Sequence, residues 1–287
     1  MNSTLKLWTT LGLGTALAGG LLAACGGEAG GEAGAGEAGI APDTAATAGE
    51  GEGGSGPGEG GGGEAAGGEG EGGVATADAA KDPVAYGIAL AVTEAHVTAA
   101  RDAYAAGKKQ AAGEMFAHPV SEVLLDMDPA FTALGVADFK PTLTAASEAA
   151  LDGKSVAEVG KAHDAIIAAL RGAATKAPKS DASPAKVEAS VIADMIERAS
   201  TMYRSLPKND SYEPYLDGYG FAAVAASHFA ASGAAIKAEN PALHARIAEA
   251  LALLKQAYPG AARPAKLPVE PGALSGASAK VMLAAGN

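Results

Sequence analysis

The chain has 287 residues, of which 48% are hydrophobic and 19% are charged, and its formal net charge is −12. The charge is concentrated near one end, because residues 26–80 hold 11 Asp and Glu side chains and no Lys or Arg. Residues 81–287, with 22 acidic and 20 basic side chains, are nearly neutral and lack the basic excess that nucleic-acid binding requires. The acidic balance of the whole chain therefore does not indicate an acidic metal-binding domain.

The first 25 residues have the three-part layout of a secretory signal. Lys6 supplies a positive charge, residues 7–22 are apolar, and the run Leu22-Ala23-Ala24-Cys25 follows. The apolar run is shorter than the roughly 20 residues that a membrane-spanning helix needs. The run ending at Cys25 resembles the lipobox of bacterial lipoproteins, in which the signal peptide is removed and the cysteine is lipidated.

This resemblance implies a signal peptide over residues 1–24 and a partner in the lipid bilayer, reached through Cys25. Cys25 is the single cysteine of the chain, so an internal disulfide is excluded. Glycine rather than aspartate at positions 26 and 27 implies, by the same resemblance, delivery to the outer membrane. The folded part would then lie in the periplasm or at the cell surface.

Residues 25–80 have the composition of a tether. Of the 48 residues from 26 to 73, 22 are glycine, and most of the others are Glu or Ala. Such a chain cannot bury enough apolar surface to offset its ordering entropy, so the sequence predicts a disordered segment. We interpret it as a solvated spacer between the membrane and the folded domain, with weak attraction of cations as the alternative.

Residues 81–287 show repeated helix-start signals, each a capping residue followed by proline. The pairs are Asp82-Pro83, Asp128-Pro129, Ser183-Pro184 and Asn240-Pro241. Ser155 with Glu158 three residues later predicts a capping box. Apolar residues recur at a spacing of three and four, and no segment alternates with a period of two, so the sequence predicts an all-α antiparallel bundle.

We expect helices at about 83–106, 110–117, 119–134 with a break near Asp128, 139–152, 155–176, 184–206, 212–237, 241–257 and 273–285. Residues 260–271 contain three prolines and little pattern, and are expected to drape over the surface.

Three of the five histidines fall on apolar stripes of these helices, namely His96, His163 and His228. Helical bundles build metal sites from inward His and carboxylate side chains. An inward histidine can also be a neutral, hydrogen-bonded core residue, and the sequence leaves both interpretations open.

Glu114, His118 and Glu122 are spaced by four residues and would share one face of an unbroken helix. Pro119 disfavours the α conformation of the residue before it, so we expect His118 at a junction where a new helix begins. His118 and Glu122 could still converge on one ion there, and imidazole with carboxylate suits iron or zinc. The alternative is that Glu114 and Glu122 are ordinary solvated carboxylates.

The run from Tyr212 to Phe221 is the most unusual segment of the domain. It resembles the helical extracytoplasmic modules of bacterial iron uptake, namely imelysin and EfeO-like proteins and the periplasmic region of iron permeases. Those modules carry Glu-Tyr-x-Asp followed by Gly-Phe, matched here at Tyr215, Asp217, Gly220 and Phe221.

Two departures from that pattern bear on the ligands. Pro214 stands at the family's acidic position, with Glu213 displaced by one residue. His118 and Glu122 resemble the imelysin His-x-x-Glu element with one additional residue between them. The resemblance implies iron binding with Asp217 as a ligand, whereas in the alternative Tyr215, Tyr219 and Phe221 pack in the core and Asp217 caps the helix.

Enzyme signatures such as Gly-x-Ser-x-Gly, His-Glu-x-x-His or a phosphate loop do not occur, and we expect no enzymatic activity. Two hypotheses follow. The first is a membrane-anchored lipoprotein whose helical module takes part in envelope metal handling, with iron or zinc as the candidate cofactor. The second is a structural or protein-interaction lipoprotein, with an envelope protein as partner and no small ligand. The candidate metal ligands are His96, His118, Glu122, Asp217 and His228.

Overall fold

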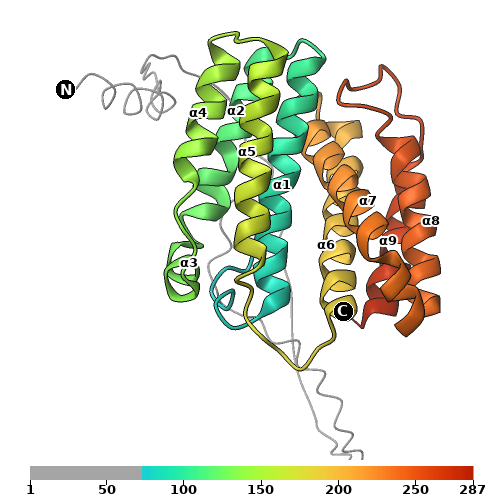
Figure 1. The fold of residues 1–287 in the computed structure, drawn as a ribbon. Coiled ribbons are helices and arrows are strands. Elements are labelled where there is room, and N and C mark those ends of the chain that lie inside the picture. Colours follow the sequence, from blue (N-terminus) through green and yellow to red (C-terminus); the bar gives the residue numbers. More distant parts are fainter. Residues whose placement is uncertain (1–72, 287) are drawn as a thin grey trace, which may run out of the picture. The chain divides into compact units, whose positions relative to one another are not determined.

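The computed structural model describes residues 73–286, and over this range all regular elements are helices, as the sequence predicts (Figure 1). The expected signal peptide over residues 1–24 and residues 25–72 of the expected tether, Cys25 included, lie outside the described residues.

The described helices form two antiparallel four-helix bundles that share one core (Figure 1). The first bundle contains α1 (Pro83–Ala105), α2 (Lys109–Pro119), α4 (Lys140–Leu151) and α5 (Val156–Ala174). The second contains α6 (Pro184–Ser205), α7 (Glu213–Glu239), α8 (Pro241–Ala257) and α9 (Pro271–Ala285). Three short elements complete the fold, namely η2 (Val120–Leu124), α3 (Asp128–Leu134) and η3 (Leu206–Lys208).

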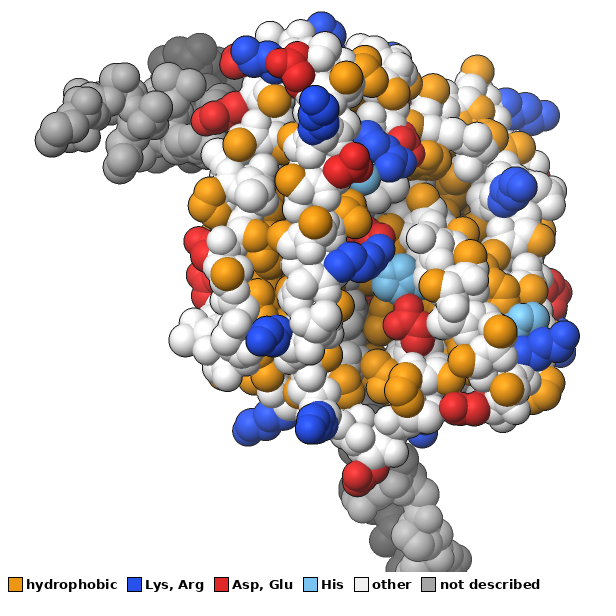
Figure 2. Space-filling model, in the orientation of Figure 1, with side chains coloured by type: hydrophobic (Ala, Val, Ile, Leu, Met, Phe, Trp, Pro, Cys, Tyr) orange, Lys and Arg blue, Asp and Glu red, His pale blue; other side chains and the backbone are white. Residues whose placement is uncertain are grey.

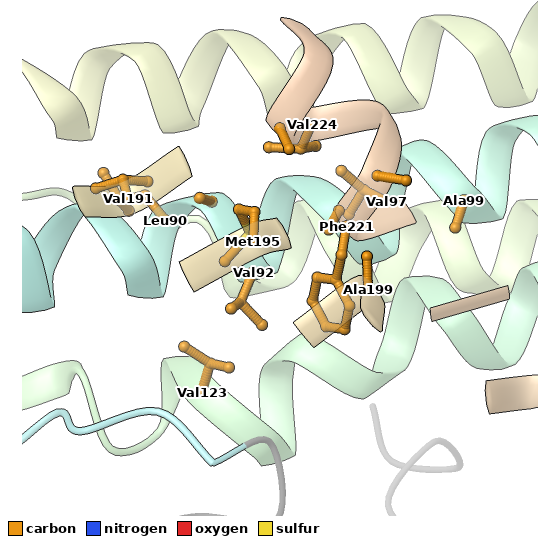
Figure 3. Packing of buried hydrophobic residues seen from close by; sticks show 14 of the residues in the cluster. Leu90, Val92, Val97, Ala99, Val123, Val191, Met195, Ala199, Phe221 and Val224 are labelled. Atoms are coloured by element: carbon orange, nitrogen blue, oxygen red, sulfur yellow. The ribbon is translucent and has the colours of Figure 1, made fainter. Parts of the chain in front are cut away.

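The bundles meet where α1 packs against α6 and α7. Among the described helices, α7 alone is long and apolar enough for a membrane span, and in this fold it packs against α1, α6 and α8. Its Gly220 allows a close approach, because a Cβ atom there would lie 2.3 Å from the carbonyl oxygen of Ala95 on α1. Figure 3 shows side chains from α1, α6, α7 and η2 meeting in the core, among them Val92, Met195, Phe221 and Val123.

Most of the predicted helix starts form as expected. The side chains of Asp82, Ser183 and Asn240 each accept a hydrogen bond from a backbone N–H in the first turn of their helix. Ser155 forms the predicted capping box. The prediction for Asp128 is wrong, because its carboxylate pairs with Lys140 instead of capping α3.

The expected helix start at Pro119 is also wrong. Pro119 is the last residue of α2, and the chain continues directly into the π-helical turn η2. The π turn follows Pro119 directly, with the Leu125 N–H bonded to the Val120 carbonyl, and the chain stays helical from Lys109 to Leu124. His118 and Glu122 therefore lie one turn apart on one continuous helical path.

The folded domain begins earlier than the predicted boundary at residue 81. Val74 is 1% exposed and Ala79 is fully buried, and the Arg198 guanidinium donates a hydrogen bond to the Gly73 carbonyl. Although composition assigns residues 73–80 to the tether, these few apolar side chains pack against the bundle.

The segment between α8 and α9 is anchored rather than loosely draped. The hydroxyls of Tyr212, Tyr215 and Tyr203 donate to the carbonyl oxygens of Ala261, Gly260 and Val269, respectively. Its Arg263 donates to the carbonyls of residues 206, 209 and 211. These bonds hold the start of α7 in place.

Candidate metal centre

His96 lies at the centre of the contact between the bundles and is 4% exposed. Its Nδ1 atom is 2.8 Å from the carbonyl oxygen of Val92, one turn earlier on α1. Because a carbonyl only accepts hydrogen bonds, Nδ1 carries the proton, and in the neutral ring the Nε2 lone pair is free. Nε2 lies 3.3 Å from Glu122 Oε2 and 3.6 Å from Asp217 Oδ1.

His118 lies on the other side of Glu122. Its Nδ1 atom is 3.7 Å from Glu122 Oε1 and 3.7 Å from Glu213 Oε1. The two imidazole rings approach edge to face, with centroids 6.1 Å apart. Glu122 thus stands between His96 and His118, with one carboxylate oxygen toward each.

One ligand atom each from His96, His118 and Asp217 lie within 4.8 Å of one another. Two imidazoles and carboxylates are a donor set that suits iron, zinc and copper. Asp217 adds a second observation, since its buried Oδ1 atom has no hydrogen-bond partner. A buried carboxylate oxygen without a partner costs free energy in the absence of a cation, so these residues fit a bound metal.

The electrostatics of the cluster favour a cation as well. Burial raises the pKa of Asp217 to about 6, although the neighbouring histidines partly oppose this. Burial disfavours the charged form of His96, but its hydrogen bond with Glu122 and the nearby carboxylates outweigh burial and raise its pKa. The hydrogen bond with His96 lowers the pKa of Glu122. A metal ion bound at the cluster would therefore compete with protons for these groups.

The fold determines the position of each ligand. Gly220 brings α7 close enough to α1 for Asp217 to reach His96, and the ring of Phe221 packs edge-on against His96 with centroids 5.9 Å apart. Asp217 therefore lies inside α7 and does not cap it. Tyr215 and Phe221 are buried in the core, and the Tyr219 hydroxyl donates to Asp102 on α1.

His228 does not belong to this cluster, so its prediction as a common ligand is wrong. Its Nδ1 atom lies 2.6 Å from Glu188 Oε1, and its Nε2 atom lies 3.5 Å from Glu94 Oε2. The Arg171 guanidinium donates two hydrogen bonds of 2.6 Å to the Glu94 carboxylate. Figure 2 shows histidine, basic and acidic side chains gathered in a hollow where α5 faces α6 and α7.

Three other residues considered from the sequence also lie elsewhere. Glu114 is exposed and accepts a hydrogen bond from Gln110. His163 is a buried residue of α5 that contacts Asp164, and the ring of His244 packs on Phe229. Glu213, by contrast, reaches the cluster although it was not among the predicted ligands. In the sequence, Glu213 is displaced from the family's ligand position because Pro214 stands before Tyr215, and helical spacing alone does not show that the first turn of α7 faces His118.

Comparison with protein-family models, with curated proteins and with solved structures found no match to this chain.

Proposed function

We propose that the helical domain binds a transition-metal cation between its two bundles, through His96, His118, Glu122 and Asp217. The observation that carries the proposal is the placement of ligand atoms from His96, His118 and Asp217 within 4.8 Å of one another, beside a partnerless carboxylate oxygen. His96 and Asp217 are more than 100 positions apart in the sequence. The ligands come from α1, from the continuous helical path of α2 and η2, and from α7.

The donor set narrows the class of ion. Imidazole ligands favour iron, zinc and copper over magnesium and calcium, which prefer sites built from oxygen alone. The described residues include no cysteine, because the single cysteine of the sequence is Cys25, so the donor set holds no thiolate and does not favour a soft metal ion. The site therefore suits a first-row transition metal.

We further propose that the domain works at the cell envelope, attached to the membrane through a lipid on Cys25 and taking part in metal handling there. The lipobox at residues 22–25 supports this part of the proposal. Cys25→Ser should abolish partitioning of the protein into detergent. Unchanged partitioning would rule out the lipid anchor without bearing on the metal site.

Metal binding is tested by dialysing chelator-treated protein against Zn²⁺ or Fe³⁺, followed by elemental analysis. We expect about one ion per chain in the wild type and none in the double variant His118→Ala, Glu122→Ala. Glu114→Gln, on the same helical path but outside the cluster, is the matched control and should bind normally. If the double variant retains the ion, the site lies elsewhere. If the wild type retains none, a protein-interaction role without a small ligand becomes the preferred function.

A further inference from the structure

The side chains of the cluster differ steadily in exposure from one end to the other. The side chain of His96 is 5% exposed, Asp217 16%, Glu122 19%, His118 24% and Glu213 60%. On the closed side, His96 is backed by the Val92 carbonyl and the ring of Phe221. The cluster is therefore most open to solvent on the side of Glu213 and His118.

The carboxylate of Glu213 lies at the solvent-exposed side of the cluster. Glu213 is the first residue of α7, and its Oε1 atom lies 3.7 Å from His118 Nδ1. It shares α7 with Asp217, one turn further on, whose carboxylate faces the buried end of the cluster. The two carboxylates of α7 thus lie at the exposed and the buried end of the cluster.

Asp217 and Glu213 occupy different positions in α7, and this gives their carboxylates different roles. Asp217 is held within α7 beside buried groups, whereas Glu213 is mostly exposed and can turn between solvent and the cluster. An exposed carboxylate at the mouth of a site attracts cations and raises their rate of association. It is also a hard oxygen ligand, which exchanges readily with water.

We propose that Glu213 is the carboxylate that captures the incoming metal cation and passes it inward to His118 and Glu122. It sets the association rate of the site rather than the final coordination. This inference rests on the proposed function, because it requires a cation to bind at the cluster.

The experiment is stopped-flow measurement of Co²⁺ association with the full-length chelator-treated protein, followed by quenching of tyrosine fluorescence. Glu213→Gln should lower the association rate constant by about tenfold at low salt, and by only about two- to threefold at 0.5 M salt, because salt screens an exposed charge. The dissociation rate constant should change by less than about twofold. Glu213→Asp retains the charge and should associate at nearly the wild-type rate.

Glu114→Gln is the control, since it removes one carboxylate from α2 a single turn before His118. It should alter the association rate by less than about twofold. An association rate for Glu213→Gln that equals the wild-type rate overturns the inference. A large rise in dissociation rate with unchanged association also overturns it, because Glu213 would then be a ligand of the final complex. Equilibrium Co²⁺ binding by the wild-type protein is measured first, and if it is absent the proposed function fails, which distinguishes this case from the two kinetic outcomes.

Discussion

The Nε2 atom of His96 on α1 lies 3.6 Å from the Oδ1 atom of Asp217 on α7, and this oxygen has no hydrogen-bond partner. The two residues belong to different four-helix bundles, so the cluster spans the contact between them. Without an ion, the protein keeps a desolvated carboxylate at this contact. Such local cost is typical of a binding site that is completed by its ligand.

Asp217→Asn should stabilise the metal-free protein at pH 8 and abolish metal binding. The pKa of Asp217 is raised from 3.8 to about 6, so the folded state carries an unfavourable charge at every pH above about 6. Its removal should raise the free energy of unfolding by about 1–2 kcal/mol at pH 8. At pH 5 the gain should be about half as large, because the carboxyl is protonated in the folded state but still ionised in the unfolded state, and the gain should vanish only below about pH 3.8. Urea unfolding at both pH values measures this, and a loss of stability at pH 8 would argue against a strained carboxylate.

His228 makes the stability of the domain depend on pH in the alkaline range. Burial opposes its charge, but hydrogen bonds with Glu188 and Glu94 outweigh burial and raise the pKa to about 9. A raised histidine pKa stabilises the fold fully below about pH 6.5, and this contribution is lost as the pH rises through 9. We expect the free energy of unfolding to fall by on the order of 2 kcal/mol between pH 7 and pH 10.

His228→Gln should be less stable than the wild type at pH 7, and its stability should change less between pH 7 and pH 10. His244→Gln on α8, outside this network, serves as the control and should keep the wild-type pH dependence. Equal slopes for wild type and His228→Gln would contradict the assignment of this pH dependence to His228.

Gly220→Ala tests the close approach of α1 and α7. The added Cβ would lie 2.3 Å from the Ala95 carbonyl oxygen, so the helices must move apart. We expect a loss of about 2 kcal/mol in the free energy of unfolding and weaker metal binding, since Asp217 moves with α7. Gly160→Ala in α5 is the matched control, because a Cβ there meets no atom within 4 Å. It should be neutral or stabilising by up to about 1 kcal/mol. A Gly220→Ala protein with wild-type stability would contradict the close helix contact.

Residues 73–80 should contribute to stability, unlike the glycine-rich segment before them. Deletion of residues 26–72 should leave the thermal midpoint nearly unchanged, because that segment has almost no large apolar side chain. Deletion of residues 26–80 removes buried Val74 and Ala79 and should cost about 2 kcal/mol or more. Identical midpoints for the two deletions would show that the domain begins near residue 81.

Much of the fold could be predicted from local signals. Capping residues before proline mark the starts of α1, α6 and α8, and apolar spacing gives the inward faces. The error at Pro119 arose because a π turn can absorb a proline inside a helical path, which no rule of local spacing reveals.

The candidate site could be predicted only in part. The inward direction of His96 and the pairing of His118 with Glu122 follow from helical spacing. The sequence does not show which face of α7 meets His96, because the crossing of α1 and α7 depends on tertiary packing at Gly220. Asp217 was predicted from a sequence motif. His228 was misassigned because it lies on α7 about three turns after Asp217, where its ring contacts Glu94 and Glu188.

Metal binding between the two bundles can be tested by X-ray absorption spectroscopy of the Zn²⁺-loaded protein, because this method counts the imidazole ligands around the ion. We expect two imidazole nitrogens together with carboxylate oxygens at about 2.0–2.2 Å. His118→Ala should reduce the imidazole count to one, and His228→Gln should leave it at two. A shell of oxygen atoms alone, or a count that falls with His228→Gln and not with His118→Ala, would contradict the site between the two bundles.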